Sequence, residues 1–257
     1  MLEVLRDGAV ATLVLSDIAR KNAMSSELGD ALAAAVSELR RDDGVRAVVL
    51  TGAGGAFSAG GDLRMLERLR GASPEDSREF MLGFYRRYLS ILDLAVPTVA
   101  AVEGPAIGAG LCVALACDVC IVDEDAKLAL NFAALGLHPG MGATYLLPRR
   151  VGALRAMDLL GTGRRFDGRE AVSMGIALRS TPAARVREEA LALARVFAAN
   201  APLVVCAIKD RLGVDRAALD AALAFEAEQQ SRSYASADFA EGMSAAAARR
   251  APLFSGR

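Results

Sequence analysis

Two glycine-rich turns constrain the fold of this chain most strongly, because each lies between an apolar, β-branched run and an apolar helical pattern. The first turn, residues 52–62, follows the strand-like residues 46–51, and the second, residues 103–110, follows the strand-like residues 98–102. A repeated order of strand, turn and helix is typical of an α/β core. Glycine also lets a ligand approach the unpaired N–H groups of a helix's first turn. The turns therefore predict an α/β fold with two clusters of free donors.

Length and charge narrow the class of protein further. The chain has 257 residues, of which 53% are hydrophobic, so it can bury a full core. Its 30 basic and 31 acidic residues are interspersed and leave a formal net charge of −1. This balance predicts neither a nucleic-acid partner nor a membrane partner. The start lacks a signal-peptide pattern and the apolar runs are short, so we expect a cytoplasmic protein.

The order of the expected elements predicts two regions. Strands and helices alternate to about residue 200, which predicts an α/β core over residues 1–200 and a helical region over residues 201–257. Pro139 has the position of a proline in the first turn of a helix. The expected strands are 4–6, 9–15, 46–51, 98–102, 119–122, 127–130 and 176–178, and the expected helices before residue 120 run from Ser25 or Ser26 to about Asp43 and over 63–69, 74–94 and 107–116.

Several known glycine, serine and cysteine motifs are not matched by this sequence. Neither turn reads Gly-x-Gly-x-x-Gly with a distant acidic residue, and neither ends in Gly-Lys-Ser/Thr, as dinucleotide and P-loop sites require. Ser58 lies in Phe-Ser-Ala-Gly rather than in a Gly-x-Ser-x-Gly elbow. Cys117 and Cys120 have metal-ligand spacing but no second pair or nearby histidine, so we expect no metal.

Several motifs together resemble the crotonase (enoyl-CoA hydratase/isomerase) superfamily. The resemblance covers nearly the whole chain and implies a spiral of ββα units with a C-terminal helical region, residues 201–257, that drives assembly into a homotrimer or a dimer of trimers. The motifs, in family order, are Arg20-Lys-Asn-Ala-Met24, Ala56-Phe-Ser-Ala-Gly-Gly-Asp-Leu63, Glu103-Gly-Pro-Ala-Ile-Gly-Ala-Gly110, Ala116-Cys-Asp118, Leu135-Gly-Leu-His-Pro-Gly-Met-Gly142 and the ending from Asp238 to Phe254.

The resemblance also implies a ligand and the residues that hold it. By motif, the amides of Gly61 and Ala109 form an oxyanion hole for the oxygen of an acyl-CoA thioester and stabilise an enolate. No cofactor is implied beyond the CoA moiety of the substrate. The residues implied to bind CoA are Arg20, Lys21, Ala23, Ser58, Ala59, Gly61, Leu63 and Arg64, and those implied to lie in the substrate pocket are Cys112, Phe132, Leu135 and Gly140.

The chain departs from the family where hydratases carry two catalytic glutamates. Cys112 and Phe132 occupy those positions. Neither replaces a carboxylate pair that activates water and shuttles a proton, so ordinary enoyl-CoA hydration is not expected. Cys112 is either a reactive thiol near a helix N-terminus or a packed core residue. Phe132 either fills the pocket space that a carboxylate and its water would occupy, or packs in the core outside the pocket.

Other side chains were weighed as proton carriers or structural groups. His138 is the only histidine and titrates near neutrality, so it is a candidate acid or base. The alternative is a histidine bonded to a neighbouring carbonyl that fixes its loop. Tyr145 is a weaker candidate, while Asp62 and Asp118 match family positions that brace turns.

Three functions remain open at this point. The first is an acyl-CoA enzyme that uses the oxyanion hole with a non-glutamate acid or base, His138 foremost, for isomerisation, hydration or another enolate-type reaction. The second is a non-catalytic acyl-CoA binding or carrier protein, which Phe132 favours. The third is an oligomerising scaffold without ligand. The length of the acyl group depends on pocket walls expected around Leu66, Met81 and Phe84.

Overall fold

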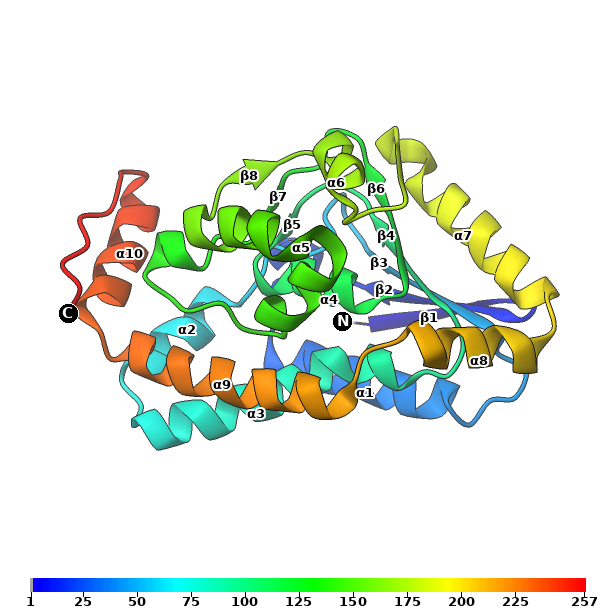
Figure 1. Ribbon diagram of the computed structural model, residues 1–257, viewed down its shortest axis with the longest axis horizontal. Helices are drawn as coiled ribbons and strands as arrows, with labels where there is room; N and C mark the ends of the chain where they lie inside the picture. The colour runs from blue at the N-terminus through cyan, green and yellow to red at the C-terminus, as the bar shows by residue number, and fades with distance from the viewer. Residues whose placement is uncertain (1) are drawn as a thin grey trace.

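A computed structural model describes residues 2–257 and contains one large and one small β-sheet (Figure 1). The large sheet has the strand order β1-β2-β3-β4-β6-β9, with β1 antiparallel to β2 and every other neighbouring pair parallel. The small sheet has the order β5-β7-β8. The strands are β1 (Leu2–Asp7), β2 (Val10–Leu15), β3 (Ala47–Gly52), β4 (Thr98–Val102), β5 (Ala106–Ile107), β6 (Val119–Asp123), β7 (Leu128–Ala129), β8 (Arg165–Phe166) and β9 (Arg179–Thr181).

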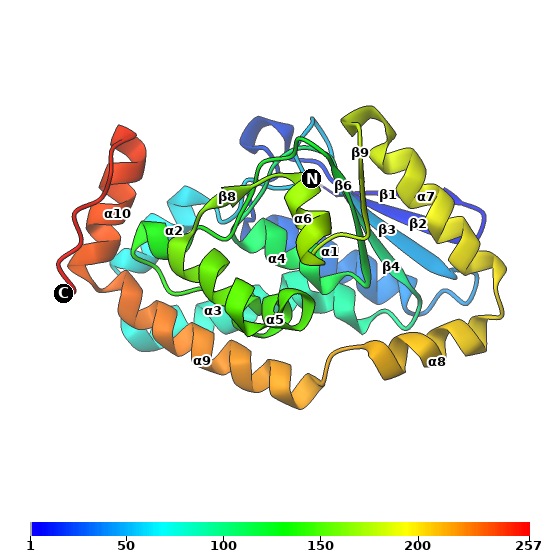
Figure 2. The same ribbon diagram turned by 45° about the horizontal axis from the view of Figure 1, so that its top comes forward.

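Ten α-helices and three short 3-10 helices connect and cover the sheets within residues 2–257. Helix α7 covers one face of the large sheet, and α1 and α4 lie on the other side (Figure 2). The helices are η1 (Ile18–Arg20), α1 (Ser26–Leu39), α2 (Leu63–Arg70), α3 (Pro74–Leu89), η2 (Ser90–Asp93), α4 (Ala109–Ala116), η3 (Ala133–Leu135), α5 (Ala143–Thr162), α6 (Gly168–Met174), α7 (Ala183–Ala199), α8 (Pro202–Leu212), α9 (Arg216–Tyr234) and α10 (Ala237–Ala248).

The central strands are buried on both faces, which explains their continuous apolar sequence. Successive side chains of a strand point to opposite faces. In β3, Val48 and Leu50 therefore pack into the main core, while Ala47 and Val49 pack beneath α7. Strands of a parallel sheet that is covered on both faces are expected to have such continuous apolar sequences.

The C-terminal helices continue around the molecule after α7. Helix α9 lies alongside α3, and α10 follows at the end of the molecule opposite α7 (Figure 1). Helix α8 has no buried residue, and four of its apolar side chains are more than half exposed. Those side chains are Leu203, Val204, Ile208 and Leu212.

Most of the expected elements are confirmed, with three corrections. Pro139 does not begin a helix, because α5 starts at Ala143 after Gly142 adopts φ 75°. The strand expected at 176–178 is instead β9, at Arg179–Thr181, where it pairs with β6. The helix expected over 74–94 ends at Leu89 and tightens into η2.

Within residues 2–257, no single helix is both long and apolar enough to cross a membrane. Helices α7 and α8 reach that length and composition only as a pair, with a bend of 114° between them.

Candidate active site

Backbone hydrogen bonds join the two glycine turns to each other. The amides of Phe57 and Ser58 both donate to Pro105 O, and the amide of Ile107 donates to Ser58 O at 3.0 Å. The contact is so close that a Cβ at Gly60 would lie 2.7 Å from Ile107 O. A Cβ at Gly110 would lie 2.6 Å from that of Ser58. Glycine is therefore needed at both positions for the turns to meet.

Asn22 anchors the first turn from outside. Its fully buried amide group donates to Ala53 O at 2.9 Å and to Ala56 O at 2.7 Å, and its Oδ1 accepts from Asp17 N. The hydroxyl of Ser58 donates to Asn22 O at 2.8 Å. Ser58 is 1% exposed, so this side chain holds the turn rather than facing a ligand.

The arrangement leaves the amides of Gly61 and Ala109 free. Met24 pairs with the residues on either side of Gly61, because its N–H donates to Gly60 O and its carbonyl accepts from Asp62 N. Ala109 is the first residue of α4, and Gly108 offers no side-chain cap. Neither amide donates to an acceptor anywhere in residues 2–257. Both residues line one pocket.

That pocket, which we call the acyl pocket, has a volume of about 230 Å³ and is mainly apolar. The expected wall residues Leu66, Met81 and Phe84 all line it, as do Phe132 and Leu135. Among the described residues, its lining contains no Asp, Glu, His, Lys, Arg or Cys. The full lining is Ala59, Gly60, Gly61, Leu63, Met65, Leu66, Met81, Phe84, Tyr85, Ile107, Gly108, Ala109, Asn131, Phe132, Leu135, Leu137, Gly140, Met141, Gln230, Tyr234 and Ala246.

Cys112 does not line the pocket, contrary to the expectation from sequence. Its side chain is fully buried behind the wall, and its thiol donates to Gly140 O at 3.6 Å. Burial raises the pKa of this thiol well above its ordinary value, and the Glu226 carboxylate adds to the rise. Cys112 therefore packs as a neutral thiol, which is the second of its two interpretations. Phe132, in contrast, lies on the pocket with 7% of its surface exposed.

The imidazole of His138 lies outside the pocket lining. Its Nδ1 is 2.7 Å from Pro139 O, and the ring meets the edge of Phe225 with 5.6 Å between centroids. Burial lowers the pKa of His138, so the ring is neutral at pH 7. This geometry favours the interpretation in which the histidine fixes its own loop, because the imidazole is not part of the pocket lining.

The remaining candidates are structural. The hydroxyl of Tyr145 accepts from Asp215 N at 3.0 Å, away from the acyl pocket. Asp62 caps α2 by accepting from the amides of Arg64 and Met65. Asp118 accepts from the amide and hydroxyl of Thr98, which confirms its expected bracing role.

The residues implied to hold CoA divide into four groups. Lys21 and Arg64 are exposed and form no ion pair with any residue in the described chain. The guanidinium of Arg20 bridges Asp17 and Asp62 and is less free to meet a phosphate. Ala59, Gly61 and Leu63 line the acyl pocket, while Ala23 and Ser58 are buried.

Five polar residues at or near the pocket were not predicted from the sequence. Asn131 lies beside Gly108 and has no hydrogen-bond partner within residues 2–257. Tyr85 donates to Gln230 Oε1 at 2.8 Å, and the Tyr234 hydroxyl lies 3.1 Å from the same oxygen. One feature of the sequence could have indicated them. The buried face of α9 includes polar residues at positions where a helix packed against the core normally has apolar ones. Those polar residues are Glu226, Gln230, Ser231 and Tyr234.

Glu226, the fifth of these residues, is a fully buried carboxylate held by neutral donors. Its oxygens accept from Gly142 N at 2.7 Å and from the amide and hydroxyl of Thr144 at 2.8 and 2.6 Å. It therefore caps the N-terminus of α5 from a distant helix. Burial outweighs these bonds and raises the pKa of Glu226 to about 7.

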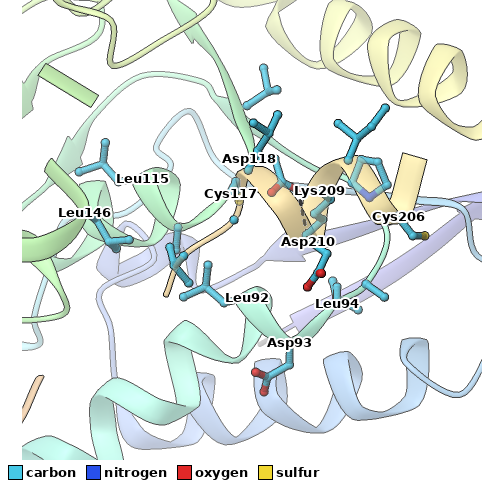
Figure 3. Close-up of a pocket in the computed structure, with 18 of the residues that line it drawn as sticks. Leu92, Asp93, Leu94, Leu115, Cys117, Asp118, Leu146, Cys206, Lys209 and Asp210 are labelled. Atoms are coloured by element: carbon cyan, nitrogen blue, oxygen red, sulfur yellow. Dashed lines mark ion pairs between the residues drawn. The ribbon is translucent and has the colours of Figure 1, made fainter. Parts of the chain in front are cut away.

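A larger cavity of about 660 Å³ lies beneath α8 (Figure 3). Its cations already have partners. Lys209 Nζ is 2.8 Å from both Asp118 and Val96 O, Arg150 donates to Cys117 O, and Arg216 pairs with Asp93. Neither glycine turn lines this cavity, whereas both line the acyl pocket, through Gly61 and Ala109. The acyl pocket is the better candidate site.

Comparisons with known proteins show the family of this chain. The sequence profile of the family described as enoyl-CoA hydratase/isomerase matches residues 6–257. A Thermus thermophilus protein, whose own assignment as an enoyl-CoA hydratase is provisional, is 42% identical over 80% of this chain and 81% of its own. The 1,2-epoxyphenylacetyl-CoA isomerase of Escherichia coli is 34% identical over 96% of this chain and 95% of its own.

A solved structure matches this chain over nearly its whole length. The crystal structure of an enoyl-CoA hydratase/isomerase from Pseudoalteromonas atlantica superimposes with a TM-score of 0.86 at 33% identity, covering 99% of each chain. The chain therefore belongs to the enoyl-CoA hydratase/isomerase family and has the crotonase fold.

Proposed function

We propose that this chain binds an acyl-CoA thioester and stabilises its enolate between the amides of Gly61 and Ala109. The observation that carries the proposal is the pair of free N–H groups on one small, apolar pocket. Fixed donors in a site that excludes water stabilise a developing oxyanion by roughly 3 kcal/mol each. The exposed cations Lys21 and Arg64 would meet the phosphates of CoA.

The pocket lining limits which proton transfers the chain can perform. Burial raises the pKa values of Tyr85 and Tyr234, so both remain protonated and act as hydrogen-bond donors. By the resemblance to the family, Phe132 would occupy the position of a hydratase carboxylate. We therefore infer an enolate-type reaction in which the chain supplies orientation and electrostatic stabilisation, while a base from solution or a basic group of the substrate takes the α-proton and its conjugate acid returns one.

A second candidate is a non-catalytic acyl-CoA binding or carrier protein. The lack of an ionisable carboxyl, imidazole or amine group in the described lining favours it. Backbone amides would still hold a thioester oxygen there. The two candidates differ in whether the bound acyl group exchanges its α-protons.

Exchange in heavy water separates these candidates. We expect NMR to show that the protein binds saturated acyl-CoAs and speeds their α-proton exchange above the rate in buffer. His138→Ala should leave that rate within about twofold, because the imidazole lies outside the pocket. Tight binding without exchange would support the carrier, and failure of every acyl-CoA to bind would contradict both candidates.

We also propose that the chain assembles as a homotrimer or a dimer of trimers through the region 201–257. The exposed apolar side chains of α8 support this proposal, because such a patch marks a contact surface. Leu203, for example, is 88% exposed.

A further inference from the structure

Three buried polar side chains form a cluster in one wall of the acyl pocket. Helices α3 and α9 form this wall. Tyr85 comes from α3, whereas Gln230 and Tyr234 lie one turn apart on α9. Each is at most 2% exposed, and all three line the pocket. Gln230 Oε1 accepts from both phenolic hydroxyls, at 2.8 Å from Tyr85 and 3.1 Å from Tyr234. The side chains that line the pocket are therefore apolar except for Asn131 and this cluster.

The orientation of the Gln230 amide follows from its other contact. Nε2 is 2.8 Å from His138 O, which can only accept a hydrogen bond. Reversing the amide would set two acceptors against each other. Nε2 carries a second hydrogen, and within residues 2–257 no other acceptor is bonded to it. The Tyr234 oxygen also keeps lone pairs after its proton is donated. The cluster can thus give one hydrogen bond and accept another.

The cluster is close to the oxyanion amides. A Cβ at Gly140 would overlap the Tyr85 hydroxyl and lie 2.6 Å from Gln230 Nε2. The carbonyl of Gly140 in turn accepts from Cys112, which is one turn of α4 beyond Ala109, a rise of roughly 4.5 Å. An acyl chain whose thioester oxygen reaches Ala109 would bring an atom a few carbons away to the cluster.

We propose that the cluster of Tyr85, Gln230 and Tyr234 selects acyl groups that carry a hydroxyl group a few carbons beyond the thioester. A hydroxyl accepts one hydrogen bond and donates another, and so matches the free N–H of Gln230 and the lone pairs of Tyr234. An unsubstituted chain would bury these groups without satisfying them. This inference rests on the proposed acyl-CoA binding at Gly61 and Ala109.

The test compares ligands of equal chain length by isothermal titration calorimetry. The ligands are pentanoyl-CoA, 4-hydroxypentanoyl-CoA and 5-hydroxypentanoyl-CoA. We expect one hydroxylated ligand to bind about tenfold more tightly than pentanoyl-CoA to the wild-type protein. Tyr234→Phe, which removes only the phenolic oxygen, should reduce that ratio to within about threefold. Gln230→Met should remove it.

Tyr145→Phe is the matched control, because its hydroxyl lies outside the acyl pocket. It should preserve the preference. The proposal is overturned if pentanoyl-CoA binds the wild-type protein as tightly as both hydroxylated ligands, or if Tyr234→Phe leaves a preference unchanged. Failure of all three ligands to bind would instead contradict the proposed acyl-CoA function, so the two failures are distinguishable. If Gln230→Met does not fold, the ligand preference of Tyr234→Phe is sufficient to test the proposal.

Discussion

Replacing Ala109 by proline is expected to slow α-proton exchange on a bound acyl-CoA by about a hundredfold or more, without unfolding the protein. Proline removes the N–H donor and puts a ring carbon where the thioester oxygen would lie. The first position of a helix tolerates proline, because the missing N–H has no partner within the helix. In residues 2–257, the Ala109 amide bonds to no acceptor, so no internal hydrogen bond is lost.

Ala109→Gly is the matched control, since it alters the same residue and keeps the N–H group. It should retain exchange to within about tenfold, and circular dichroism should show both variants folded. Equal exchange rates in Ala109→Pro and the wild-type protein would show that this amide is not part of an oxyanion hole.

Glu226 is expected to make the protein less stable as the pH rises from about 4.5 to above 7. Its pKa is raised from 4.5 to about 7 in the folded protein because its carboxyl is buried. The folded state therefore holds the proton more tightly than the unfolded state. The stabilisation is complete below pH 4.5 and is lost as the pH rises through about 7. The loss is about 3 kcal/mol in the free energy of unfolding.

The measurement compares the wild-type protein with Glu226→Gln by urea denaturation at several pH values. Carboxylates with lowered pKa values, such as Glu241, change stability in the opposite direction in both proteins, so the difference between the two isolates Glu226. Glutamine keeps one oxygen, which can accept from Thr144 in place of Oε1, while its NH2 group would face the Gly142 amide. The free energy of unfolding of the variant should increase relative to that of the wild-type protein as the pH rises to 8. A difference that is constant from pH 5 to pH 8 would contradict the raised pKa.

The sequence predicts the paired turns well because close contact between their backbones requires glycine at particular positions. Gly60 and Gly110 are required by atoms less than 3 Å from where their Cβ would lie. Asp62, next to the first turn, is recognisable as a helix cap for the same reason. Short-range geometry of this kind is written in residue type and spacing, so the two turns could be expected from the sequence, while Gly61 and Ala109 were named within them by the resemblance to the family.

The polar side of the pocket could not be predicted in the same way. Tyr85 and Gln230 are 145 residues apart and meet only because α9 packs along α3. No local pattern marks such a pair. The helical region 201–257 was expected to serve assembly, yet α9 also forms part of the pocket wall through Gln230 and Tyr234. His138 was a candidate acid or base because of its residue type, and only the direction of its ring revealed the bond to Pro139.

The most direct test of the account is the carbonyl stretching frequency of a bound acyl-CoA labelled with 13C at its thioester carbon. Isotope-edited infrared spectroscopy should show a shift to lower frequency on binding to the wild-type protein, because two fixed N–H donors polarise the bond. The shift should be smaller in Ala109→Pro and unchanged in Ala109→Gly. A bound thioester whose carbonyl absorbs at or above its frequency in buffer would contradict an oxyanion hole at Gly61 and Ala109.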